Sequence, residues 1–363
     1  MSKIRSLIAQ FRHTLDPLRG LDESQWLSSV GRNAPMAVGV AVPDWRGVYS
    51  SVANLFPACL PVRDALTKRS AGRVAELILQ TGASRVVFGS FAPTYIHLLR
   101  ALEQASRKIE VYSISYGSFM QSNERTGWTM LQLLKQLVVE GRIKKLGFAK
   151  AGMAEVYHRL GVRSAFVMHT VDKVPAAASV PLPGGPHLGL AAVSLATWRK
   201  LPFAMLAAVT EIPDAVLHIA GAQGRVAEFV RQMRLDARIS PQPLPQSELP
   251  QMLRSMHLNL YVTLSECCPM LPLESLAEGA PCLTGPNSHL FEDSAYLRSR
   301  LIVDYPERND VIARYIRQAL HERDEIIGAY RKWLPGYSEQ CRRSVASFLD
   351  LSAAQQYLPR NAA

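Results

Sequence analysis

The chain has 363 residues, of which 48% are hydrophobic and 20% are charged. This is the composition of a globular protein, so it excludes a disordered or collagen-like chain, and the length favours two domains. Lysine and arginine number 41 against 30 aspartate and glutamate, which gives a formal net charge of +11. That charge leaves three kinds of partner open: nucleic acid, an anionic membrane surface and a phosphorylated substrate.

No apolar run reaches the roughly 18 residues that a membrane-spanning helix requires, and basic residues interrupt the N-terminal apolar pattern where a signal peptide would be continuous. The five cysteines are an odd number without the spacing of a disulfide framework, which is typical of a reducing compartment. We therefore expect a cytoplasmic protein.

Segment 1–20 carries apolar residues at the i, i+3, i+4, i+7 spacing of one helical face. Four basic residues against one acidic residue give this segment a charge of +3. The pattern predicts an amphipathic helix within an N-terminal extension, residues 1–35. Two interpretations remain open: the helix packs on the protein or on a dimer partner, or it lies in the interface of a membrane.

From residue 36 onward, strand and helix patterns alternate, which is typical of a parallel sheet wound on both faces. We assign residues 36–178 to a first Rossmann-like domain. The predicted strands are 36–42, 85–88, 109–115 and 165–169, and the predicted helices are 71–80, 94–106, 129–140 and 151–160.

Residues 173–187 carry four prolines and two adjacent glycines, so they predict a linker, which we place at 179–187. The alternation then restarts and defines a second Rossmann-like domain, residues 188–333. A C-terminal segment, residues 334–363, is predicted to form a helix that crosses back to the first domain. We therefore expect an α/β fold of two doubly wound domains facing a central cleft. In the second half the predicted strands are 188–194, 215–220, 258–264, 281–284 and 301–304, and the predicted helices are 202–210, 225–233, 246–255, 271–278, 311–334 and 337–351.

The stretch 265–274 (SECCPMLPLE) lies between a buried strand and a helix. Ligands of doubly wound sheets bind beyond the carboxyl ends of the strands, which is where Glu266 falls. Glu274 follows early on the next helix, and two carboxylates there could accept hydrogen bonds from sugar or ribose hydroxyls. The backbone N–H groups of residues 268–271 could meet an anion such as a diphosphate. Spacing alone leaves open that both glutamates are ordinary surface residues.

Residues 265–281 (SECCPMLPLESLAEGAP) resemble the Glu-x7-Glu signature of retaining glycosyltransferases of family 4, which have the GT-B fold. Glu266 and Glu274 match the two glutamates, and Gly279 and Pro281 match the closing Gly-x-Pro. Cys-Cys-Pro at 267–269 stands where the family has Gly-Phe-Gly. The resemblance implies that Glu266 contacts the transferred sugar and that Glu274 contacts the ribose of the nucleotide.

Segment 193–201 (VSLATWRKL) is similar to the family's Gly-Arg-(x)4-Lys-Gly loop, which holds the donor diphosphate. Lys200 matches the lysine, and Leu195 stands at the arginine position, with Arg199 as the candidate substitute. The resemblance implies catalytic roles for Lys200, Arg199 and Glu266. Tyr116 and Ser118 fall on the acceptor side, with Tyr116 where the family has a histidine. The implied donor-binding residues besides Glu274 are Cys268, Pro269, Met270, Leu271, Gly221 and Gly47.

The resemblance implies transfer of a sugar from a nucleotide-diphosphate sugar to a hydroxyl acceptor, with retention of configuration. A charged diphosphate leaves without protonation, so we expect a metal-independent enzyme with no cofactor beyond its donor substrate. The nine histidines show no His-Glu-x-x-His spacing, and Cys-x-x-Cys is absent. The usual setting is the synthesis of bacterial surface polysaccharide or glycolipid, with a glycan or lipid-linked acceptor.

Two other functions remain open: a basic non-catalytic nucleic-acid-binding or scaffold protein, and a nucleic-acid-modifying glycosyltransferase. Both need a basic stripe with interleaved aromatic residues, but the basic cluster 142–150 contains only one, Phe148. We therefore rank a phosphate-bearing substrate first, a membrane surface second and nucleic acid last. Basic residues in the acceptor half also suit contact with the inner face of the cytoplasmic membrane, through residues 1–20. The oligomeric state stays open.

Overall fold

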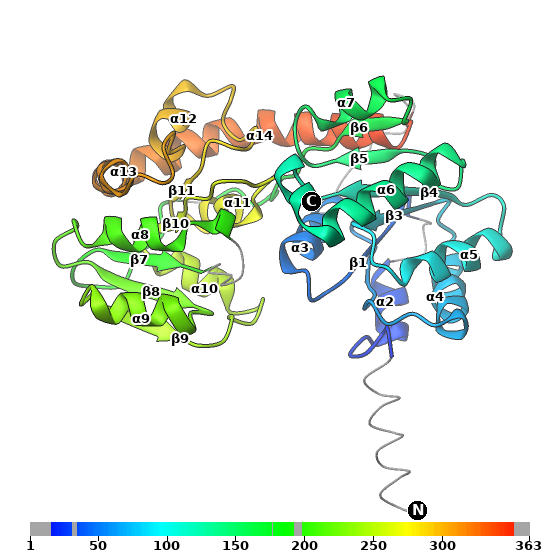
Figure 1. Cartoon of the computed structure of the whole chain (residues 1–363), viewed down its shortest axis with the longest axis horizontal. Helices are drawn as coiled ribbons and strands as arrows, with labels where there is room; N and C mark the ends of the chain where they lie inside the picture. The colour runs from blue at the N-terminus through cyan, green and yellow to red at the C-terminus, as the bar shows by residue number, and fades with distance from the viewer. Residues whose placement is uncertain (1–15, 31–34, 176, 192–197, 352–363) are drawn as a thin grey trace, which may run out of the picture. The chain divides into compact units, whose positions relative to one another are not determined.

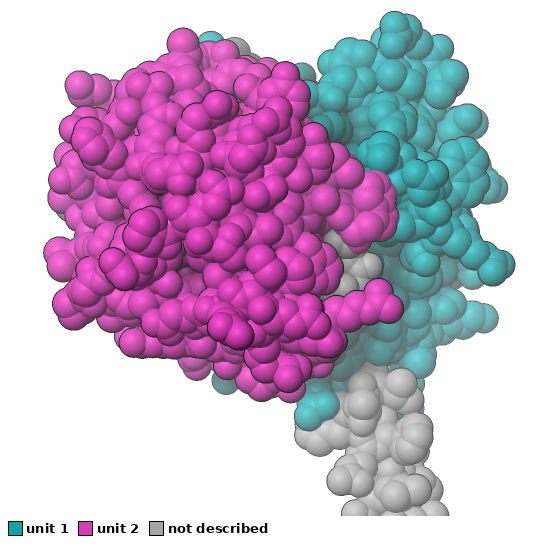
Figure 2. All heavy atoms as spheres, turned by 60° about the vertical axis from the view of Figure 1, so that its left-hand side comes forward, with its two compact units in different colours: residues 1–169, 341–363 teal, residues 170–340 magenta. Residues whose placement is uncertain are grey.

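The computed structural model describes residues 16–30, 35–175, 177–191 and 198–351. The chain forms two compact units: unit 1 contains residues 1–169 and 341–363, and unit 2 contains residues 170–340 (Figures 1 and 2). Each unit is built on its own parallel sheet, so the predicted α/β fold of two doubly wound domains is confirmed. Most of the amphipathic helix predicted for residues 1–20 lies outside the described residues. No helix in the described part is long and apolar enough to cross a membrane.

Unit 1 contains a six-stranded parallel sheet in the order β2-β1-β3-β4-β5-β6, with helices between the strands (Figure 1). Its central strands β1 and β3 are buried except for the half-buried first residue of β3, as expected for a parallel sheet that helices cover on both faces. The strands are β1 (Val38–Ala41), β2 (Cys59–Pro61), β3 (Arg85–Gly89), β4 (Glu110–Ser115), β5 (Leu146–Phe148) and β6 (Ser164–Phe166), and the helices are α2 (Glu23–Val30), α3 (Arg46–Leu55), α4 (Lys68–Gln80), α5 (Tyr95–Ala105), η1 (Phe119–Asn123), α6 (Arg125–Val139) and α7 (Met153–Arg159).

Several elements of unit 1 are not predicted by the sequence pattern, among them β5, β2 and α3. β5 lies inside the basic stretch 142–150. Its three residues, Leu-Gly-Phe, are too short a run to predict a strand. β2 has three residues and ends at a proline, which sequence reasoning treats as a break. The turn residues before Gly47 mark the start of α3 rather than an open loop, so Gly47 is the second residue of a helix.

Unit 2 contains a five-stranded parallel sheet in the order β11-β10-β7-β8-β9 (Figure 1). The edge strand β9 is missing from the sequence prediction because its four residues are all exposed or half-buried and form no apolar run. The strands are β7 (His187–Leu190), β8 (Val216–Ala220), β9 (Ala237–Ser240), β10 (Leu258–Tyr261) and β11 (Cys282–Thr284), and the helices are η2 (Trp198–Lys200), α8 (Pro202–Val209), α9 (Gly224–Gln232), α10 (Leu249–Arg254), α11 (Met270–Ala277), α12 (Ala295–Leu301), α13 (Asn309–His321) and α14 (Arg323–Phe348).

The C-terminal part differs from the prediction in three places. The helices predicted at 311–334 and 337–351 are instead α13 and α14, and α14 continues through Pro335. The strand predicted at 301–304 is the end of α12 followed by a single bridge between Thr284 and Ile302. The boundary between the units falls within α14, so its last residues belong to unit 1, where the Phe348 ring packs edge-on against Tyr112 at 5.3 Å.

The proline-rich segment predicted as a linker lies against unit 2. The backbone N–H of Ser179 donates to the carbonyl of Gly279 at 2.8 Å, and that of Leu182 donates to Ser255 at 3.0 Å. Gly279 has φ +81°, and a Cβ there would lie 2.6 Å from the Ala177 carbonyl. Glycine is therefore required where α11 ends and this segment passes over it.

Three histidines form a hydrogen-bonded cluster in unit 2. His187 Nε2 lies 3.1 Å from the Pro183 carbonyl, which can only accept, so Nε2 carries the proton. His187 Nδ1 therefore accepts from Nε2 of His218 at 2.9 Å. His257 Nδ1 accepts from the His187 backbone N–H at 3.0 Å. Burial and the neighbouring His187 and Arg238 lower the pKa of His218 to about 4.

This depressed pKa predicts acid sensitivity of unit 2. A histidine whose folded pKa is about 4 and whose ordinary pKa is 6.5 stabilises the fold fully above pH 6.5 and loses that contribution as the pH falls toward 4. In His218→Gln, the amide can still donate to His187 but does not titrate. We expect the melting temperature of this variant to fall less than that of the wild type between pH 7 and pH 4.5. Equal slopes in the two proteins would contradict the assignment.

Candidate functional site

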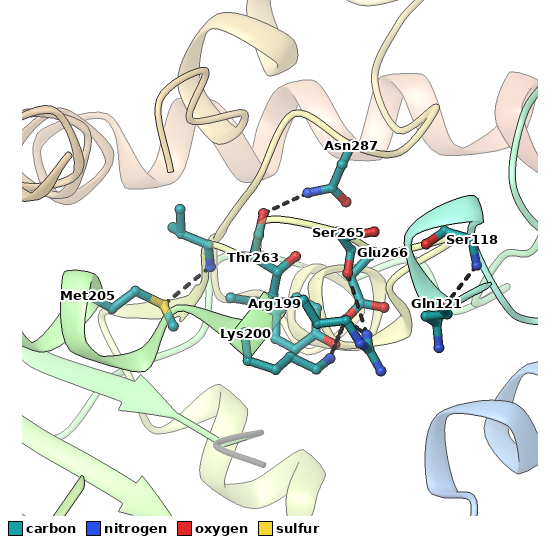
Figure 3. A network of polar contacts seen from close by, with 11 residues as sticks. Ser118, Gln121, Arg199, Lys200, Met205, Thr263, Ser265, Glu266 and Asn287 are labelled. Atoms are coloured by element: carbon teal, nitrogen blue, oxygen red, sulfur yellow. Dashed lines mark hydrogen bonds and ion pairs between the residues drawn. The ribbon is translucent and has the colours of Figure 1, made fainter. Parts of the chain in front are cut away.

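A cluster of charged and polar side chains gathers beyond the carboxyl end of β10 (Figure 3). Glu266 Oε1 accepts a hydrogen bond from Arg199 Nη1 at 3.1 Å and from the Tyr261 hydroxyl at 3.0 Å. The Lys200 ammonium forms an ion pair with the same carboxylate oxygen and also donates to the Tyr261 hydroxyl. The side chains of Arg199, Lys200 and Glu266 are 13–14% exposed, so the cluster is largely buried.

Two loops of unit 2 hold this cluster in place. The backbone N–H of Leu264 donates to the carbonyl of Arg199 at 2.7 Å, which ties the loop after β10 to η2. Leu201 has φ +46°, and Pro202 then begins α8 at the position where a missing N–H costs nothing. This sharp entry into α8 sets Arg199 and Lys200 just before the helix, against the end of β10.

Burial dominates the electrostatics of the cluster. It lowers the pKa of Lys200, although the Glu266 carboxylate acts in the opposite direction. It raises the pKa of Tyr261 well above its ordinary value, so this hydroxyl stays protonated and acts as a donor. The Lys200 ammonium also lies 4.4 Å from the centre of the Tyr261 ring, a cation–π distance.

Among the ion pairs of the described residues, the two cations Arg199 and Lys200 share the single carboxylate of Glu266, so these three side chains together carry a net positive charge. They can therefore stabilise a further anion, and low exposure strengthens that interaction relative to water. In the described part of the chain, the hydrogen bonds to Glu266 all end on Oε1. Its second oxygen, Oε2, accepts none from these residues.

α11 follows the cluster directly and carries the second glutamate. Cys267, Cys268, Met270 and Leu271 are buried in unit 2. Pro269 precedes the first residue of α11 and has no N–H, which reduces the number of backbone donors predicted for residues 268–271. Glu274 is half-buried in the second turn.

The predicted acceptor residues lie in unit 1. Tyr116 directly follows β4, and its hydroxyl lies 2.9 Å from Nε2 of His169, which is fully buried. The backbone N–H of Ser118 donates to Oε1 of Gln121 at 2.9 Å (Figure 3). Ser118 is the N-cap residue of η1. Gly47 lies in α3 of the same unit.

Gly221 follows β8 in unit 2, with φ +79°, and its N–H donates to the carbonyls of Ser240 at 2.9 Å and Gln242 at 3.1 Å. It therefore forms a tight turn, as the sequence suggests. Position Leu195, aligned with the family's arginine, lies outside the described residues. Among the residues described, no group of three or more His, Cys, Asp or Glu is arranged to hold a metal ion.

Sequence reasoning missed two residues of these sites. Tyr261 is the last residue of the apolar strand β10, so by sequence its ring looks like an ordinary core residue. A tyrosine hydroxyl at the carboxyl end of a strand is only a weak indication of a functional site. His169 falls at the end of the predicted strand 165–169, and only the fold brings its ring to Tyr116.

The two α/β units are those of the GT-B fold of glycosyltransferases. The chain is similar to sucrose-phosphate synthase from Thermosynechococcus elongatus, with a TM-score of 0.55 and 11% identity over 86% of this chain and 100% of that chain. It is also similar to a glycosyltransferase from Rickettsia africae, with a TM-score of 0.57 and 11% identity over 87% and 98%. A third similar structure is the UDP-forming α,α-trehalose-phosphate synthase from Burkholderia xenovorans in complex with glucose-6-phosphate, with a TM-score of 0.54 and 10% identity over 85% and 97%.

By sequence, no protein-family model matches the chain, and no curated protein matches it. The likeness is therefore one of fold.

Proposed function

We propose that the protein is a metal-independent, retaining glycosyltransferase that moves a sugar from a nucleotide-diphosphate sugar to a hydroxyl acceptor. The observation that carries this proposal is the buried cluster of Lys200, Arg199 and Glu266 at the carboxyl end of β10. The net positive charge of its three side chains suits a diphosphate, and Glu266 Oε2, which accepts no hydrogen bond from the residues that the structure describes, suits a sugar hydroxyl.

In this proposal the cluster acts on the leaving group. Negative charge grows on the diphosphate as the bond to the sugar breaks, and Lys200 and Arg199 stabilise it. A leaving group that is stable as an anion needs no proton from a general acid. Glu266 orients the two cations through Oε1 and binds the sugar through Oε2, while the neutral Tyr261 hydroxyl fixes the carboxylate. Glu274 on α11 binds the ribose hydroxyls.

The acceptor side is proposed to include Tyr116 and Ser118 of unit 1, with a glycan or lipid-linked acceptor in the synthesis of a bacterial surface polysaccharide or glycolipid. The UDP-forming activity in the name of the Burkholderia synthase supports uridine diphosphate sugars as the first donors to test. Contact with the inner face of the cytoplasmic membrane through residues 1–20 is part of the same proposal.

The basic stretch 142–150 supports neither a nucleic-acid interface nor a membrane-binding surface. Arg142 pairs with Glu103 at 2.8 Å, and Lys144 and Lys145 pair with Glu110 and Asp350. Its charge is therefore largely compensated within unit 1. Phosphate backbones are bound by cations that are free to contact them.

A thermal-shift screen tests the donor site. UDP-, GDP-, dTDP- and CMP-sugars are added to the full chain in the presence of EDTA, and at least one is expected to raise the melting temperature. Glu274→Ala should reduce that shift, whereas Glu292→Ala, at an exposed position of the same unit, should keep it. The absence of stabilisation by all four donor classes would contradict the proposed function.

A further inference from the structure

Unit 2 contains a cavity of about 480 Å³ that shares no residue with the Lys200 cluster. It lies between one face of strands β8 and β9 and the helix α10. Cavities of roughly 300–1,000 Å³ are the usual size of small-molecule sites. The residues that argue for a ligand here are His218, Ala220, Arg238, Ser240, Glu248 and Met252.

The cavity exists because small and polar residues replace core residues on this face of the sheet. His218 is in register with Arg238, and Ala220 is in register with Ser240, on the neighbouring strands β8 and β9. Residues two apart on a strand share one face, so all four line the same surface. None of them is a large aliphatic residue that could fill the space under a helix.

The helix above this face is held from its other side. Leu249 and Leu253 of α10 pack against Tyr261, Leu271 and Cys282 in a separate apolar cluster. Those contacts fix the helix without help from the sheet face below it. The opposite side of the helix, which carries Glu248, Gln251, Met252 and Ser255, therefore overlooks the cavity.

Arg238 and His218 are the charged and titratable side chains on the sheet side of the cavity. The Arg238 guanidinium forms no ion pair with any residue that the structure describes, and it lines the cavity next to His218. His218 uses its Nε2 proton on His187, so its Nδ1 atom is an acceptor. Burial and Arg238 lower the pKa of His218 to about 4, so it is neutral near pH 7 and Arg238 alone supplies positive charge.

The remaining wall combines apolar side chains with the polar residues Glu248, Gln251 and Ser255 of the helix side. Leu182, Leu244, Met252 and Met256 present aliphatic and thioether surface, and methionine adapts its shape to varied ligands. Glu248 belongs to the α10 wall rather than to the sheet wall that holds Arg238. The Glu248 carboxylate would repel the anionic group of a ligand. A ligand is therefore favoured that places its anionic group at Arg238 and its apolar part near α10.

We propose that this cavity binds a small amphipathic anion, an apolar body that carries one carboxylate, sulfonate or phosphate group, at a site separate from the donor site. The anionic group lies at Arg238, and the apolar body lies against Met252 and Met256 beneath α10. This proposal does not depend on the glycosyltransferase activity.

The test uses 8-anilinonaphthalene-1-sulfonate as the anionic probe and N-phenyl-1-naphthylamine as its neutral counterpart, both followed by fluorescence with the full chain at pH 7.5. Arg238→Met is expected to weaken binding of the sulfonate about tenfold, because a charge-assisted hydrogen bond is lost, and to leave the neutral probe unchanged. Glu248→Gln is expected to tighten binding of the sulfonate severalfold. Arg231→Met, at an exposed position of α9, is the matched control for removal of a surface cation.

A second variant tests the space rather than the charge. Ser240→Phe places a ring in the cavity and is expected to abolish saturable binding of both probes, with its folding checked by circular dichroism. Unchanged probe binding in both Arg238→Met and Ser240→Phe would overturn the proposal. UDP added to the same proteins separates the two sites: a thermal shift by UDP that survives Arg238→Met agrees with a separate site, and its loss would show that the cavity belongs to the nucleotide site.

Discussion

Replacing Lys200 with alanine is expected to lower kcat by on the order of 10²-fold, the effect of removing one well-placed donor from a developing anion. KM for the donor should change less, because the diphosphate gains its extra charge only as the bond breaks. Arg199 remains in this variant and accounts for the residual rate. The measurement is steady-state release of nucleoside diphosphate with the donor found by thermal shift.

Two control variants sharpen this result. Lys200→Arg keeps the positive charge next to Glu266 and should recover part of the lost rate. Lys332→Ala removes an exposed lysine of α14 and should have no effect. Full activity of Lys200→Ala would show that Lys200 has no catalytic role. It would leave the assignment of the fold unchanged.

Replacing Glu266 with alanine is expected both to abolish transfer and to destabilise unit 2. The carboxylate is 14% exposed and is shared by Arg199 and Lys200, so its removal leaves two largely buried cations without this partner. Breaking such an arrangement costs about 3 kcal/mol, toward the low end for buried pairs because some solvent reaches the site. Urea denaturation, with Glu292→Ala as the exposed control, measures this cost.

Glu266→Gln separates the two roles of the residue. The amide oxygen can still accept from Tyr261 and Arg199, so we expect a smaller loss of stability than with alanine. The charge is lost, so transfer should remain strongly impaired. A glutamine variant with the stability and activity of the wild type would show that the carboxylate charge has neither role.

Much of the fold can be predicted from the sequence, because strands buried on both faces of a parallel sheet appear as short apolar runs between amphipathic helices. β1, β4, β8 and β10 lie where those runs predict them. β5 escapes this reasoning because it has only three residues and follows two lysines, and β9 because its four residues are exposed or half-buried. Their strand conformation comes from the neighbouring strands, whose free backbone groups they satisfy.

The candidate site is predictable only in part. Glu266 and Lys200 are found by the resemblance of their local motifs, because each lies beside a loop at a strand end. Their shared ion pair is not predictable, because it joins residues 66 positions apart in the chain. The Tyr261 hydroxyl contacts both members of this ion pair, and no sequence motif identifies Tyr261.

By itself the sequence determined the class of architecture and the two loops that carry the glutamate and the lysine, since periodicity and turn chemistry are local properties of the chain. The tertiary structure decided which of the basic residues behind the +11 net charge are paired and which line a site. It pairs most of the basic stretch 142–150 within unit 1, sets Arg199 and Lys200 on one carboxylate, and places Arg238 in the wall of the cavity of unit 2. The physical reason is that pairing and burial of charge depend on strand order and register, which bring together residues that lie far apart in the chain.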